Sequence, residues 1–113
     1  IIDKNVLSYA IEKTLAFAKD VFENPIIMNL NTNKLTLVNE NEEYGTLESN
    51  IDKIDWKYEK FQIKFNANYL KEALKSFEGL IKIGFNNNDQ AFVVSNVNDK
   101  ELEYLILPYR ILE

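Results

Sequence analysis

The sequence contains no cysteine and no histidine among its 113 residues. It therefore has no disulfide framework and no thiol nucleophile, and it lacks the side chain that most often acts as a general base near neutral pH. Cysteine and histidine are also the usual ligands of structural zinc. These absences exclude Ser-His-Asp catalysis and ordinary zinc sites, and we expect neither an enzyme nor a bound cofactor.

Long apolar segments are also absent. No run approaches the roughly 20 residues that a membrane span requires, and no charged start followed by a short apolar stretch indicates a signal peptide. Glycine occurs only three times, and Gly45 and Gly84 stand alone, so no phosphate-binding loop is predicted. We expect a cytoplasmic protein that does not contact a membrane.

The residues that are abundant are those of a folded core. Hydrophobic residues make up 46% of the chain, including seven Phe and six Tyr, and the formal net charge is −5. A chain of this length forms one core but not two. The composition predicts a single domain over residues 1–113.

The first helix is predicted from apolar residues at three-to-four spacing. Asn5 or Asp3 is expected to cap it, and Asn24-Pro25 is expected to end it. The expected core face comprises Val6, Leu7, Ala10, Ile11, Thr14, Leu15 and Ala18.

Strands are predicted from aliphatic or alternating segments between Asn-rich turns. The expected strands are 26–30, 34–38, 44–51, 61–65, 80–85, 92–94 and 104–107, with a short edge strand at 1–2. A second helix is expected to begin at the cap Asn66, to bury Leu70, Ala73, Leu74 and Phe77, and to end at Gly79 in a left-handed conformation.

The order of these elements is strand, helix and three strands, and the same order follows again. We predict an α+β fold in which a β-α-β-β-β unit is duplicated and two helices pack on one face of antiparallel sheet. The acidic residues at 40–43, together with Asp52 and Asp55, are expected to be solvated loop charges, because they lack the spacing of a calcium loop.

Two segments connect this fold to a known family. The first reads Phe65-Asn66-Ala67-Asn68-Tyr69-Leu70 and opens the second helix. The second reads Leu105-Ile106-Leu107-Pro108-Tyr109-Arg110 and ends the last strand. Together they resemble the third, C-terminal domain of the bacterial sliding clamp, the DNA polymerase III beta subunit, which has Phe-Asn-x-x-Tyr-Leu and an apolar strand running into Pro-x-Arg.

The resemblance implies a non-catalytic processivity factor. A clamp is a homodimeric ring that encircles double-stranded DNA without reading its sequence and docks polymerase, clamp-loader and repair proteins through short peptides. Because a clamp subunit has three such domains and this chain begins at Ile1, we expect it to be a segment of a longer protein. A clamp-like peptide-binding adaptor that does not encircle DNA is the alternative.

The resemblance also implies a peptide-binding wall, made of Asn66, Tyr69, Leu105, Ile106, Leu107, Pro108, Tyr109, Arg110 and Ile111. We expect the strand to leave its sheet at Pro108, since proline cannot donate to a ladder, and to free Leu107 and Tyr109 for an apolar anchor. Other interpretations stay open: Leu105 and Leu107, or Ile106 alone, could be core, and Asn66 could serve only as a helix cap.

Two further surfaces follow from the resemblance. Clamp helices line the central hole, so Lys13, Lys19, Lys71 and Lys75 are expected to face DNA, although lysine on an exposed helix face is ordinary solvation. Val21-Phe22 takes the place of an apolar pair that helps to close the ring, and it could equally cover the local core.

Overall fold

The computed structural model describes residues 1–17, 25–41, 45–52, 54–99 and 101–109. Predictions for Ala18, Asn24 and Tyr44 lie outside these residues. The elements are β1 (Ile2–Asp3), α1 (Lys4–Phe17), β2 (Pro25–Asn31), β3 (Lys34–Asn41), β4 (Gly45–Ile51), β5 (Phe61–Asn66), α2 (Ala67–Leu74), β6 (Leu80–Gly84), β7 (Phe92–Asn96), β8 (Glu103–Ile106) and β9 (Pro108–Tyr109).

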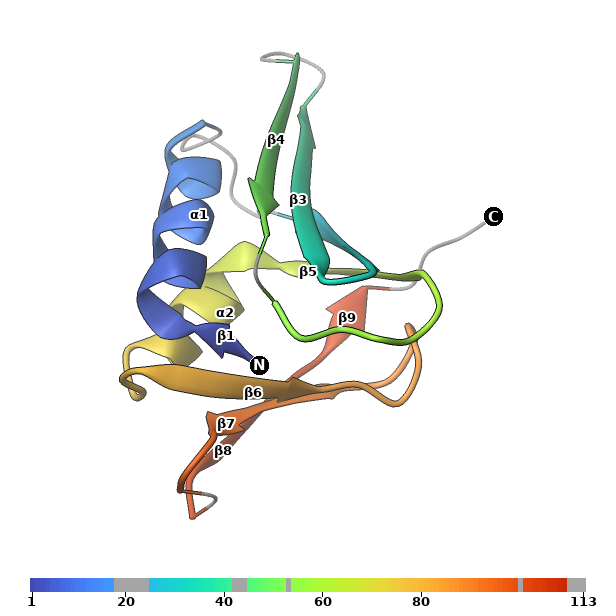
Figure 1. The fold of residues 1–113 in the computed structure, drawn as a ribbon. Helices are drawn as coiled ribbons and strands as arrows, with labels where there is room; N and C mark the ends of the chain where they lie inside the picture. Colours follow the sequence, from blue (N-terminus) through green and yellow to red (C-terminus); the bar gives the residue numbers. More distant parts are fainter. Residues whose placement is uncertain (18–24, 42–44, 53, 100, 110–113) are drawn as a thin grey trace.

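The strands form two antiparallel sheets, in the orders β1-β6-β7-β8 and β4-β3-β2-β5-β9. The first strand of each repeated unit pairs with the other unit, because β1 lies beside β6 and β5 lies beside β2. The α+β class and the duplicated order are confirmed. The two helices lie side by side against antiparallel strands, as predicted, and the strands are divided between two sheets (Figure 1).

Helix α1 begins at Lys4 because Asp3 caps it. The Asp3 Oδ1 accepts a hydrogen bond from the Asn5 backbone N–H at 2.8 Å, so Asp3 and not Asn5 is the cap. The buried face consists of Leu7, Ala10, Ile11 and Thr14. The expectation for Val6 is wrong, since this side chain is 47% exposed; one residue rotates a helix by about 100°, which places Val6 at the margin of the stripe.

The hairpin of β2 and β3 is confirmed. The two strands pair from Ile27↔Val38 to Asn31↔Lys34. Asn33 sits in the turn with φ 59°, a left-handed conformation that Asn tolerates better than most residues. Strand β3 continues past Val38, and its Glu40 pairs with Thr46 of β4. Glu40 is solvent-exposed, as expected, but it lies in a strand and not in a loop.

Helix α2 ends earlier than predicted. It stops at Leu74, and residues 75–77 continue as tight turns in which each N–H donates to the carbonyl three residues back. Phe77 is nevertheless buried. Gly79 has the expected positive φ, 72°, and its carbonyl accepts a hydrogen bond from Lys4 N–H at 2.8 Å. The turn that follows the second helix is therefore hydrogen-bonded to the start of the first helix.

The core lies between the two sheets and the helices. Phe65 of β5 and Phe92 of β7 meet edge to face, with ring centroids 5.1 Å apart, and so connect one sheet to the other. Inside the core, Thr14 Oγ1 donates to Ala10 O at 3.0 Å, and Asn39 Nδ2 donates to Thr14 O at 3.4 Å. These bonds satisfy buried polar groups and hold α1 against β3.

The connector between β4 and β5 is held by the single tryptophan. Trp56 is half-buried and packs against Tyr58, Phe61 and Phe85. Its indole N–H donates to the Glu59 carbonyl at 3.1 Å. In the described ranges, neither helix is long and apolar enough to cross a membrane.

Candidate functional site

The two segments that define the resemblance meet in space. Strand β9 pairs antiparallel with β5, with Phe65 opposite Pro108 and Lys64 opposite Tyr109. One step further in this register places Leu107 opposite Asn66, where α2 begins. Residues about 40 positions apart in the sequence are thus adjacent at one end of the β5 strand (Figure 1).

Asn66 is the N-cap of α2. Its Oδ1 accepts a hydrogen bond from Asn68 N–H at 3.0 Å, and its backbone is extended, with φ −80° and ψ 118°. The residue is buried. The capping role is confirmed, whereas a role in binding peptide stays a prediction. One turn further along α2, Tyr69 is 56% exposed.

Exposed and buried apolar side chains alternate from Leu105 to Leu107, at the end of β8 and directly after it. Ile106 is 3% exposed and pairs with Phe92, whereas Leu105 and Leu107 are 70% and 71% exposed. Of the two core interpretations, the one that assigns Ile106 alone to the core is correct. Leu105 and Leu107 remain mostly exposed in the folded domain. Their apolar surface is therefore available to a partner.

The path of the chain at Pro108 differs from the expected one. Strand β8 ends at Ile106, as the proline predicts, but the chain then joins the other sheet as β9. Pro108 and Tyr109 are half-buried there. The prediction that Leu107 and Tyr109 would both be freed is therefore correct for Leu107 only.

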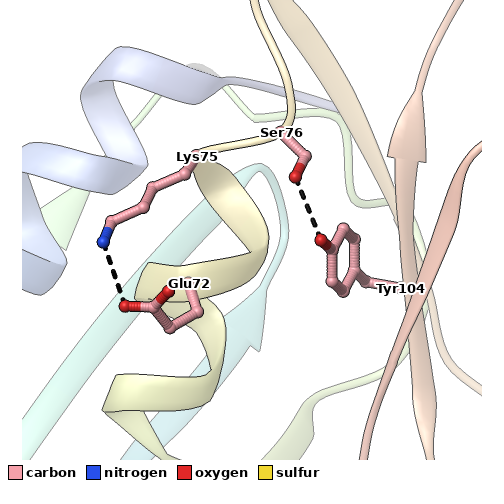
Figure 2. Close-up of polar contacts among 4 residues, drawn as sticks. All are labelled: Glu72, Lys75, Ser76 and Tyr104. Atoms are coloured by element: carbon pink, nitrogen blue, oxygen red, sulfur yellow. Dashed lines mark hydrogen bonds and ion pairs between the residues drawn. The ribbon is translucent and has the colours of Figure 1, made fainter.

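Tyr104 holds β8 against the end of α2, a contact that the sequence pattern did not predict. Its hydroxyl lies 3.0 Å from Ser76 Oγ, within hydrogen-bond distance (Figure 2). Its ring meets Phe77 edge to face, with centroids 5.8 Å apart. Leu105 thus lies in a strand that contacts the turn after the second helix, and Leu107 directly follows that strand.

The helix lysines lie in three different situations. Lys13 is exposed on α1, with its ammonium 4.7 Å from the centroid of the exposed Tyr9 ring. Lys71 is half-buried. Lys75 forms an exposed ion pair with Glu72 at 3.0 Å (Figure 2). Such a pair stabilises the helix by only about 0.3–0.5 kcal/mol, so Lys75 is readily available to another anion.

Several predicted site residues lie outside the described part of the chain. They are Lys19, Val21, Phe22, Arg110 and Ile111.

The acidic residues that the structure describes do not assemble into a metal centre. Within the described ranges, no group of three or more His, Cys, Asp or Glu residues is placed to hold a metal ion. Asp52 and Asp55 are exposed in the connector, as predicted. What the described site offers is an exposed apolar surface beside a helix start, which suits non-covalent docking.

Comparison with known proteins gives a consistent result. The profile described as "DNA polymerase III beta subunit, C-terminal domain" matches residues 1–110. A beta sliding clamp of Staphylococcus aureus is 26% identical over 110 residues, covering 96% of this chain and 29% of that protein. The chain therefore spans less than a third of the length of the curated relatives that it matches.

Solved structures share the fold. A Caulobacter crescentus beta sliding clamp superposes with a TM-score of 0.90 at 21% identity, covering 97% of this chain and 29% of its own. A DNA polymerase III beta subunit of Thermotoga maritima gives 0.89 at 18% identity, with 98% and 30% covered. At these identities the likeness establishes the architecture of the domain.

Proposed function

The chain belongs to the family formed by the C-terminal domains of DNA polymerase III beta subunits, and from this we propose that it is the third domain of a sliding clamp that confers processivity on a DNA polymerase. The observation that carries the proposal is the match over residues 1–110, together with the meeting of its two signature segments at the β5–β9 pair. A clamp encircles DNA and tethers the polymerase to it. The tether keeps the polymerase at a high effective concentration on the DNA.

The proposed docking wall is the exposed surface around Tyr69, Leu105 and Leu107. These three side chains are each more than half exposed, and Tyr104, next to Leu105, contacts Ser76 and Phe77. Burial of an exposed leucine by a partner contributes about 1.5–3 kcal/mol. Short peptides of polymerase, clamp-loader and repair proteins are the proposed ligands, and Arg110 and Ile111 would complete the wall.

The proposed DNA-facing surface is the pair of helices. Lys13, Lys71 and Lys75, together with Lys19, would contact phosphates without reading bases, as sliding requires. Around each helix the lysines are matched by acidic residues, so the net charge of −5 falls on strands and loops. A ring that is less acidic inside than outside would repel DNA except at its channel.

The remaining features of the proposal concern the assembly. We propose a homodimeric, non-catalytic ring in the cytoplasm, without a cofactor, in which Val21 and Phe22 contribute to the interface between the two protomers. The Staphylococcus aureus and Caulobacter crescentus relatives are named as beta sliding clamps, which favours the ring over a stand-alone adaptor.

The decisive experiment for a ring is topological. The longer protein that carries this chain is loaded on a nicked circular DNA by its clamp loader, and the DNA is then cut once. We expect the protein to stay on the circle through gel filtration and to be lost from the linear DNA. Equal retention on both forms would support an adaptor that binds DNA, or its proteins, directly.

A further inference from the structure

Tyr9 is a large aromatic residue on the side of α1 that faces away from the core. It lies two positions from Leu7 and two from Ile11, both of which are fully buried. Two positions correspond to about 200° around a helix, so Tyr9 points almost opposite to the buried face. It is 65% exposed. Packing into the core therefore does not account for an aromatic ring at this position.

The side chain that the Tyr9 ring contacts is Lys13. The Lys13 ammonium lies 4.7 Å from the centroid of the ring, which is within the distance of about 6 Å for cation–π attraction. The two residues are four positions apart, so their side chains are neighbours on the helix surface. The contact restrains the long lysine side chain and brings no negative charge to it. Lys13 is thus held in place with its charge uncompensated.

The helix neighbours of Lys13 leave this charge without a partner of opposite sign. The residues three and four positions away are Tyr9, Ala10, Ala16 and Phe17. Lys75 of α2 differs, because Glu72 forms an ion pair with it at 3.0 Å. A glutamate at position 9 would be well placed to neutralise Lys13, since Glu four residues before Lys is the favourable order on a helix. The chain has a neutral aromatic ring there instead.

We propose that Tyr9 is a positioning residue for contact with DNA. Its ring holds the Lys13 ammonium at the exposed surface of α1, where the ammonium meets a phosphate without first leaving a carboxylate. An ammonium has three N–H donors, so the donors that point away from the ring remain available to the phosphate. The inference rests on the proposed function, in which α1 faces DNA, and it adds the residue that orients the lysine.

The first part of the test uses the 113-residue chain without DNA. Protons above the face of an aromatic ring are shielded, so their NMR signals move upfield. We expect the methylene protons beside the Lys13 ammonium to be shifted upfield in the wild-type chain and in Tyr9→Phe, which keeps the ring. In Tyr9→Leu the same protons should have the shift of an ordinary exposed lysine. An ordinary shift in the wild-type chain would overturn the proposal.

The second part follows the Lys13 signals while a short DNA duplex is added. Tyr9→Phe should bind as the wild-type chain does, and Tyr9→Leu about two- to fivefold more weakly, because the cation–π restraint is lost. Tyr9→Glu should bind about tenfold more weakly or worse, because the new carboxylate competes with the phosphate for Lys13.

Asn86→Glu is the matched charge control for Tyr9→Glu. It adds the same charge at an exposed position in the turn after β6, across the molecule from α1 (Figure 1). At about 0.1 M salt, exposed charges more than about 10 Å apart are largely screened. This variant should therefore bind the duplex within about twofold of the wild-type chain.

Three results of the titration would overturn the proposal. They are Lys13 signals that the duplex does not move, a Tyr9→Glu variant that binds no more weakly than Asn86→Glu, and a Tyr9→Phe variant as weak as Tyr9→Leu. None of these measurements requires a loaded ring, so their failure would leave the clamp proposal untouched. Failure of the ring experiment would in turn leave the Tyr9 dependence of duplex binding to be read from the titration.

Discussion

Replacing Phe65 with alanine is expected to lower the free energy of unfolding by about 3–5 kcal/mol. Phe65 is fully buried in β5 and meets Phe92 of the other sheet at 5.1 Å. Its loss would leave a cavity at the contact between the sheets, directly before the Asn66 cap. Since small domains are stable by about 5–15 kcal/mol, Phe65→Ala should bring the protein close to unfolding.

Urea denaturation followed by Trp56 fluorescence measures this effect. Tyr69→Ala is the matched aromatic control, because Tyr69 is 56% exposed and exposed positions usually change stability by less than about 0.5 kcal/mol. Phe65→Leu should fall between the two, as it retains much of the volume. Equal midpoints for Phe65→Ala and Tyr69→Ala would show that the sheets are not connected through this ring.

Replacing Leu107 with alanine is expected to weaken peptide binding by about tenfold or more, equivalent to about 1.4 kcal/mol. Leu107 is 71% exposed, so its truncation removes apolar contact from a partner without opening a cavity in the core. The affinity of the longer protein for a Gln-x-x-Leu-Phe peptide would be measured by calorimetry. The urea midpoint should stay nearly unchanged.

Leu102→Ala is the control for Leu107→Ala. Leu102 is an exposed leucine before β8, five residues away, which is roughly 17 Å along an extended chain. It should leave peptide affinity unchanged. If both variants weakened binding equally, the effect would not be local to the β8–β9 crossing, and the assignment of the wall would be wrong.

Most elements of the fold are predictable because their signals are local. The Asp3 and Asn66 caps, the alternation in β5 and the Asn33 turn each depend on neighbouring residues. The division into two sheets is different, because it depends on which strands β1 and β5 choose as partners. Strand pairing depends on contacts between residues far apart in the chain, and the local hydrophobic pattern of a strand does not indicate its partner.

The residues of the candidate site could be predicted from the sequence, but their solvent exposure could not. Leu105, Ile106 and Leu107 read alike in sequence, and only the pairing of Ile106 with Phe92 separates core from surface. Strand β9 has two residues, one of them proline, and therefore gives no strand signal. The contact of Tyr104 with Ser76 depends on the path of α2, which ends before the predicted Gly79.

A proton–nitrogen NMR titration of the 113-residue chain with a Gln-x-x-Leu-Phe peptide tests the central claim most directly. The expected result is a set of shifts clustered at Asn66, Tyr69 and the segment from Leu107 onward, even if the single domain binds weakly. Saturating peptide with no shifts there, or with shifts centred on the β4 edge, would contradict the assignment of this surface as the docking wall of a clamp.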